Sequence, residues 1–262
     1  MRRLDEFDIL KGIGILLVML GHTPVVLNLH NVIYSFHLPL FFIVSGYFFK
    51  PQAVAAYAYK LFLRLLVPWL FFASLFTALS FAFCLIGSTG FAAAFQKLWH
   101  SLNPLDEQCW QLYRTIWFLI SLFFALNFYN FLCKYLKNQL LLGGAIVTFH
   151  LLGYFFGHSF NIPFFIDTAL SVLIFIYIGN MSKNFHVEQK LSKPKWSSLF
   201  VVGIIIAFLL QPSISLRENL YPIYMAPLAI VIVAGLFSFC FQISRYNNII
   251  KRFLVICGIE SL

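Results

Sequence analysis

Two histidines, His22 and His37, lie inside apolar segments near the beginning of the chain. An ionisable ring in hydrocarbon costs free energy unless it is paired or used, so each is a candidate functional residue. His22 lies seven residues before Leu29, where the first segment ends, and His37 lies five residues after Val32, where the second begins. With a helical rise of about 1.5 Å per residue, both would lie roughly 8 to 11 Å below the same membrane face. A hairpin of two helices would therefore bring the histidines close together.

Lys11 precedes His22 by 11 residues. At about 100° per residue, a spacing of 11 residues is about three turns plus roughly 20°. Both side chains would therefore lie on one stripe of a helix, about 16 Å apart along its axis. Gly14 and Gly21 would let another helix or a slender ligand approach the backbone closely. Pro24 would kink the helix just past His22. A cation at one end of the stripe and a base at the other suit a ligand that reaches in from one face.

The composition indicates that these residues belong to a membrane protein. Of the 262 residues, 61% are hydrophobic and only 10% are charged, with a mean hydropathy of +0.87. Such a chain has too little polar surface to cover a water-soluble globule. The sequence therefore predicts an all-α, polytopic transmembrane helix bundle.

A membrane span needs about 20 apolar residues, and runs of this kind recur along the chain. Transmembrane strands would be shorter and would alternate polar with apolar residues, which does not fit. A ninth run begins near Phe253. The eight predicted spans before it cover residues 9–29, 32–49, 61–86, 116–133, 140–156, 162–178, 196–214 and 220–241.

The basic residues predict that the N-terminus is cytoplasmic, because cytoplasmic loops collect Lys and Arg. With that orientation all of the 18 Lys and Arg residues except Lys97, Arg114 and Arg217 lie at cytoplasmic ends. The net charge of +9 then mainly reflects basic residues at the cytoplasmic ends of the spans, and it does not indicate nucleic-acid binding. The five cysteines are spread singly, so neither a disulfide framework nor a metal site is expected.

The end of the chain is too short for its last helix to cross a membrane. After Arg252 only ten residues remain, about 15 Å of helix against roughly 30 Å of hydrocarbon. We therefore expect residues 1–262 to form a single transmembrane domain with about nine spans, the last incomplete, and to be truncated at the C-terminus.

Several motifs along nearly the whole chain resemble the integral-membrane acyltransferase type three family. The opening carries a basic residue, ten intervening residues and then a histidine, as that family does. The positions that carry the resemblance are Arg3, Asp8, Lys11, Gly12, Gly21-His22, Ser35 to Phe42, Ser45-Gly46, Lys60, Arg64, Pro68-Trp69, Trp117 to Leu119 and residues 162–179. Ser45-Gly46 lacks the context of a nucleophile elbow and is expected to serve close helix packing.

The resemblance implies a multi-pass enzyme of the bacterial inner membrane. Such enzymes take an acyl group, usually acetyl, from cytoplasmic acyl-CoA and pass it to a hydroxyl of a glycan or related envelope molecule. The expected partners are therefore acyl-CoA as co-substrate, an envelope acceptor and membrane lipids, with no permanently bound cofactor and no metal.

The resemblance also suggests roles for particular residues. Lys11, Lys60 and Arg64 would hold the phosphates of the coenzyme at the cytoplasmic face. His22 would be the general base that activates the acceptor hydroxyl, or a transient acyl carrier in a two-step reaction. His37 would orient the acceptor, stabilise the oxyanion or share the proton transfer.

Three residues are candidates for acceptor binding. Arg114 and Trp117 lie one helical turn apart at the outer end of the fourth span, which suits a charge beside a stacking platform for a sugar. Asp167, near the outer end of the sixth span, would hold a ring in one tautomer.

The same residue types also occur in membrane proteins for structural reasons. A histidine can bond a backbone carbonyl of a neighbouring helix, and lysines snorkel at helix ends. A transporter or flippase of a glycan or lipid intermediate also fits intramembrane histidines, although transporters more often show inverted repeats, and none is evident here. An inactive, truncated member of the family is a third possibility.

Overall fold

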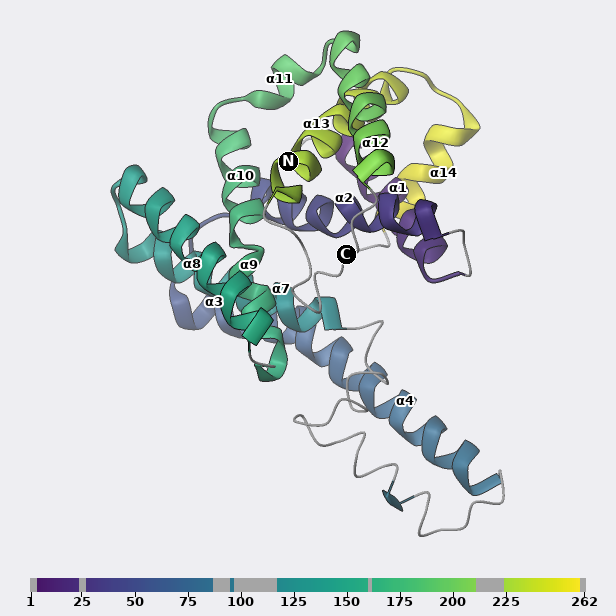
Figure 1. The fold of residues 1–262 in the computed structure, drawn as a ribbon, viewed down its shortest axis with the longest axis vertical. Helices are drawn as coiled ribbons and strands as arrows, with labels where there is room; N and C mark the ends of the chain where they lie inside the picture. The colour runs from purple at the N-terminus through teal and green to yellow at the C-terminus, as the bar shows by residue number, and fades with distance from the viewer. Residues whose placement is uncertain are drawn as a thin grey trace. The chain divides into compact units, whose positions relative to one another are not determined.

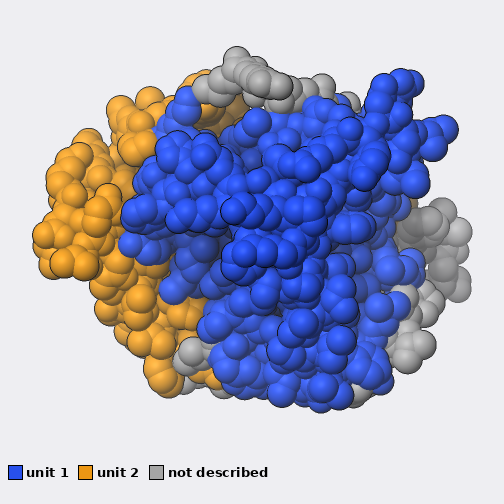
Figure 2. Space-filling model, turned by 90° about the horizontal axis from the view of Figure 1, so that it is seen from above, with its two compact units in different colours: residues 1–50, 174–262 blue, residues 51–173 orange. Residues whose placement is uncertain are grey.

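The computed structural model describes residues 4–23, 27–86, 95–96, 117–159, 162–210 and 224–259. Within these ranges all regular secondary structure is helical, which confirms the all-α prediction. The chain packs as two compact units, one of residues 1–50 and 174–262 and the other of residues 51–173 (Figure 2). Each unit is described by itself below.

The first unit contains both ends of the described chain. Its helices pack mainly around α1 and α2, with α1 against α2, α13 and α14, and α2 against α12 and α13 (Figure 1). From Ile174 onward α10 belongs to this unit. The elements are α1 (Asp5–Gly21), α2 (Leu27–Tyr47), α10 (Leu173–Asn184), α11 (Val187–Leu191), η3 (Pro194–Ser197), α12 (Ser198–Leu210), α13 (Met225–Ser244) and α14 (Ile249–Ile259).

Glycines allow the closest helix contacts in this unit. A Cβ atom on Gly12 would collide with the carbonyl of Leu254, and one on Gly258 would collide with the carbonyl of Asp8. The backbones of α1 and α14 therefore touch. Gly46 of α2 lies in the same way against the carbonyl of Ile176 in α10, so the expected packing role of Ser45-Gly46 is confirmed for the glycine.

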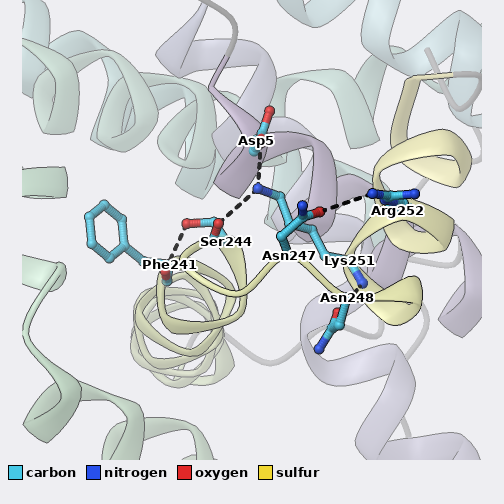
Figure 3. A network of polar contacts seen from close by, with 7 residues as sticks. All are labelled: Asp5, Phe241, Ser244, Asn247, Asn248, Lys251 and Arg252. Carbon is cyan, nitrogen blue, oxygen red and sulfur yellow. Dashed lines mark hydrogen bonds and ion pairs between the residues drawn. The ribbon is translucent and has the colours of Figure 1, made fainter.

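Polar contacts join α1, α13 and α14 at one end (Figure 3). The Lys251 ammonium lies 2.8 Å from an Asp5 carboxylate oxygen and donates to the Ser244 carbonyl, also at 2.8 Å. Ser244 ends α13, and a cation beside the last carbonyls of a helix is favourable. Lys251 therefore links the beginning of α1 to the end of α13.

The second unit is built on α7. Helices α3 and α9 pack against α7, and α8 packs against α9. Figure 1 shows α4 continuing away from α7, α8 and α9. The elements are α3 (Val54–Leu61), a π-helical turn η1 (Phe62–Leu66), α4 (Val67–Ile86), α7 (Trp117–Tyr135), α8 (Gln139–Ser159), a 3-10 turn η2 (Pro163–Phe165) and α9 (Ile166–Ser171).

Within the described residues, five helical stretches are long and apolar enough to cross a membrane. They correspond to the second, third, fourth, fifth and eighth predicted spans. The total of about nine spans and the cytoplasmic N-terminus stay predictions. The five stretches are Asn28–Tyr47, Val54–Leu79, Trp117–Tyr135, Gln139–Gly157 and Met225–Ser244.

The predicted first span, residues 9–29, is wrong as a single helix. Helix α1 ends at Gly21, and α2 already begins at Leu27. The Thr23 hydroxyl donates to the Leu20 carbonyl at 2.7 Å, which satisfies one of the free carbonyls at the end of the helix. Pro24, the expected cause of a kink, lies outside the described residues.

The predicted sixth span, residues 162–178, is also wrong as one helix. It consists of η2, the short helix α9 and the beginning of α10. Phe164 and Phe165 have φ angles of 61° and 56°, in the left-handed region that bulky side chains rarely adopt. This conformation separates Pro163 from α9, and α9 itself ends at Ser171 before α10 begins at Leu173, although the residues remain apolar. Of the seventh predicted span, the described residues 196–210 belong to η3 and the 13-residue α12.

Candidate functional site

His22 follows the last residue of α1 directly. Its backbone N–H lies 3.2 Å from the carbonyl oxygens of both Val18 and Met19, so the residue continues the helical path as a cap. The side chain is exposed. An accessible imidazole at a helix end can meet a substrate without displacing packed side chains.

His37 lies in the middle of α2 and is only 3% exposed. Its Nδ1 atom lies 2.8 Å from the carbonyl oxygen of Ile33. A carbonyl oxygen only accepts hydrogen bonds, so Nδ1 must carry the proton of this bond. In the neutral ring the lone pair is then on Nε2, which can accept a proton.

His22 directly follows α1 and His37 lies in α2, and these two helices pack against each other. Gly21, beside His22, faces the ring of Tyr34, which a Cβ on the glycine would approach to 3.0 Å. The Tyr34 ring lies edge-on to His37, with 4.8 Å between ring centroids. Helices α1 and α2 therefore bring both candidate catalytic rings into one part of the first unit.

Lys11 lies on α1, and its ammonium is 2.9 Å from a carboxylate oxygen of Asp8, one turn earlier. Both side chains are largely covered, at 15% and 14% exposure. Lys11 is thus held by an acidic neighbour instead of extending freely along the helix.

The glycine face of α1 is occupied by α2. A Cβ on Gly14 would approach the Phe41 ring to 2.9 Å and Leu40 to 3.2 Å, while Gly21 faces Tyr34. Either another helix or a slender ligand was expected on this face. In the structure helix α2 lies there.

Lys60 and Arg64 belong to the second unit, and both are exposed. Lys60 is near the end of α3, and Arg64 lies inside the π-helical turn η1. Such turns are rare and are frequent at functional sites. A shared phosphate site with Lys11 stays a prediction, because Lys11 belongs to the other unit.

Trp117 and Asp167 lie in neighbouring elements of the second unit. Trp117 begins α7, is 8% exposed and packs against Phe165, with 5.6 Å between ring centroids. Asp167 is in the first turn of α9 and is 6% exposed. The structure therefore brings these two acceptor candidates to the contact between α7 and the η2–α9 segment. Arg114 lies outside the described residues.

Comparison with protein families gives one match that covers nearly the whole chain. Residues 4–258 match the family model described as an acyltransferase domain. The chain belongs to the acyltransferase 3 family. Comparisons with curated proteins and with solved structures gave no match. Family membership and the apolar helices together support a membrane-bound acyltransferase.

The acyltransferase has a further histidine beside this site that the sequence pattern alone did not single out. His30 stacks on Tyr34 with 4.0 Å between ring centroids, and its buried Nδ1 atom has no hydrogen-bond partner among the described residues. His30, Tyr34 and His37 are spaced i, i+4 and i+7, so they share one face of α2. This spacing is visible in the sequence and would have indicated a row of aromatic rings.

His150 of the acyltransferase, to which the sequence assigns no role, is structural in the described arrangement. Its Nδ1 bonds the carbonyl of Ser171, the last residue of α9. The imidazole thus satisfies a carbonyl at a helix end that would otherwise be unpaired. Among the described residues, no group of three or more His, Cys, Asp or Glu side chains could hold a metal ion.

Proposed function

We propose that this acyltransferase moves an acyl group, most simply acetyl, from cytoplasmic acyl-CoA to a hydroxyl of a glycan or another envelope molecule. The observation that carries the proposal is the position of His22 and His37 on two helices that pack against each other, in a chain from this family. Transfer from a thioester to a hydroxyl needs a base near neutral pH, and imidazole suits that task.

In the proposed reaction His22 removes the proton of the acceptor hydroxyl as its oxygen attacks the thioester carbonyl. The C–O bond forms, the C–S bond breaks, and the leaving thiolate of coenzyme A takes the proton back from the histidine. Its exposure favours His22 for this role. A two-step route would instead place the acyl group on His22 for a short time before the acceptor arrives.

The hydrogen bond of His37 favours one of its expected roles. Because Nδ1–H is used by Ile33, the free Nε2 of the neutral ring is an acceptor and cannot donate to an oxyanion. Sharing the proton with His22, or accepting a hydrogen bond from the acceptor hydroxyl, therefore fits better than oxyanion stabilisation.

Donor binding is proposed to use cationic side chains. Lys11, Lys60 and Arg64 would contact the phosphates of acyl-CoA, which is a co-substrate and leaves after each turnover. Lys11 would exchange the Asp8 carboxylate for a phosphate. Arg114, Trp117 and Asp167 are proposed to contact the acceptor.

The proposed setting is the inner membrane of a bacterium, with the N-terminus in the cytoplasm where acyl-CoA is made. The donor, an envelope acceptor and membrane lipids are the proposed partners, and nucleic acid is not among them. The oligomeric state is left open.

The proposal is tested by mass spectrometry of envelope glycans from cells that contain the protein, lack it, or carry His22→Ala. An acyl substituent that is present only with the intact protein is the expected result. His186→Ala is the matched control, since His186 is exposed and pairs only at the surface with Glu188, at 3.5 Å. Identical glycans in all strains would contradict the proposed activity.

A further inference from the structure

The second unit contains a cavity of about 360 Å³ that the proposed reaction does not use. It lies between the start of α3 and helices α7, α8 and α9, and its walls are the apolar side chains of residues such as Phe124, Phe131 and Phe149. The polar exception is Asn127, whose amide donates to the Phe123 carbonyl of its own helix at 2.8 Å. The volume is in the range of small-molecule sites, but the wall can recognise only an apolar group.

The walls belong to helices that are long and apolar enough to cross a membrane. The stretches Trp117–Tyr135 and Gln139–Gly157 supply two sides, and Val54 begins a third such stretch. Along α7 the lining extends from Phe124 to Leu132, about 12 Å. At this depth the surrounding medium is hydrocarbon, so the natural occupant of an apolar cavity is an acyl chain.

One end of the cavity lies near the end of α7. The spanning stretch of α7 ends at Tyr135, and Phe131 in the cavity wall is one turn before it. Gln52 and Asn130 are joined by two hydrogen bonds of 3.0 and 3.1 Å, which fixes the start of α3 beside this end of α7.

Two lysines lie near this end of α7 in the sequence. The Phe131 and Tyr135 rings pack with 4.6 Å between centroids, and the Lys134 ammonium lies 5.6 Å from the Tyr135 centroid. Lys137 lies two residues after α7 ends at Tyr135, and both lysines are exposed. No ion pair to either lysine occurs within the part of the chain that the structure describes.

We propose that this cavity binds an anionic glycerophospholipid, with one acyl chain between α7, α8 and α9 and the phosphate at Lys134 and Lys137. An apolar slot with exposed ammonium groups near the end of the same helix matches a hydrocarbon chain attached to an anion. The site is independent of the proposed acyl transfer, because it shares no residue with the proposed catalytic or donor-binding sets.

The first test maps the site directly. The full chain is reconstituted in phosphatidylcholine vesicles that contain phosphatidylglycerol with a photoactivatable group in one acyl chain, and labelled peptides are identified by mass spectrometry. We expect label on residues 124–132 and 149, removed by excess unlabelled phosphatidylglycerol but not by phosphatidylcholine. The exposed apolar face of α12, which includes Val201 and Leu209, is the internal control. Labelling of α12 as strong as that of residues 124–132 would overturn the proposal. Stronger competition by a long-chain acyl-CoA than by phosphatidylglycerol would also overturn it.

The second test uses variants. Lys134→Gln should weaken phosphatidylglycerol binding about fivefold, and adding Lys137→Gln should weaken it by a similar factor again. Lys195→Gln is the matched control, because this exposed lysine also lies over an aromatic ring, Trp196, at 5.0 Å, but belongs to η3 of the other unit. Leu170→Phe should fill the cavity and reduce chain labelling severalfold. Unchanged binding in the Lys134 variant would overturn the proposal, and the wild-type mapping decides it even if a variant fails to fold.

Discussion

The Nδ1 atom of His37 lies 2.8 Å from the carbonyl oxygen of Ile33, one turn earlier on α2. This contact fixes the proton on Nδ1 and leaves Nε2 as the proton acceptor of a buried ring. His22, directly after the neighbouring helix α1, is exposed. One hairpin thus presents an accessible imidazole and a fixed, buried one.

Replacing His22 tests the proposed base. His22→Ala is expected to lower kcat for acyl transfer at least about 100-fold, a barrier increase of about 3 kcal/mol or more, because a positioned general base contributes that much. Binding of acyl-CoA should change little. The measurement is acyl transfer by reconstituted protein together with donor binding, and wild-type kcat in the variant would contradict the mechanism.

Lys11 tests the donor site. Lys11→Ala is expected to raise KM for acyl-CoA more than KM for the acceptor, and added salt should have the same effect on the wild type. Asp8→Asn, which removes the carboxylate 2.9 Å away, should not raise the donor KM. If both variants raise both KM values equally, the ion pair is structural and Lys11 does not bind the coenzyme.

The contact between α1 and α14 predicts a difference between two identical substitutions. Gly258→Ala should destabilise the protein by about 1 to 3 kcal/mol, because the new methyl group would collide with the Asp8 carbonyl. Gly144→Ala, with no atom within 4 Å of its Cβ position, should be neutral or slightly stabilising. Thermal unfolding in detergent compares them, and equal Tm values would contradict the close approach of the two helices.

Asn130 tests the attachment of α3 to α7. This side chain is 1% exposed and bonds both the N–H and the carbonyl of Gln52. Asn130→Leu should cost about 1 to 3 kcal/mol for each backbone group left unpaired in a buried position. Asn127→Leu on the same helix should cost much less, because its amide bonds only its own helix. Similar loss of stability in both variants would show that the Gln52 contact is unimportant.

The sequence by itself determined the class of the protein and singled out its candidate catalytic residues. Composition requires apolar helices, because so few charged residues cannot cover a soluble globule. The spacing of His22 and His37 around a chain reversal predicts their proximity, since helices of similar length joined by a short connection pack side by side. The motifs around them also indicated the family that residues 4–258 match.

Only the tertiary structure decided how these helices end and what fills the space between them. Hydropathy reports which residues avoid water, and it does not register the positive φ angles of Phe164 and Phe165 that break the predicted sixth span. Nor does it say which neighbour occupies a glycine face, and here α14 lies against Gly12 while α2 lies against Gly14. Hydropathy also does not predict the stacking of His30 on Tyr34 or the cavity beside Phe131. They depend on side-chain directions and on contacts between segments far apart in the chain, which a local pattern of residue types does not contain.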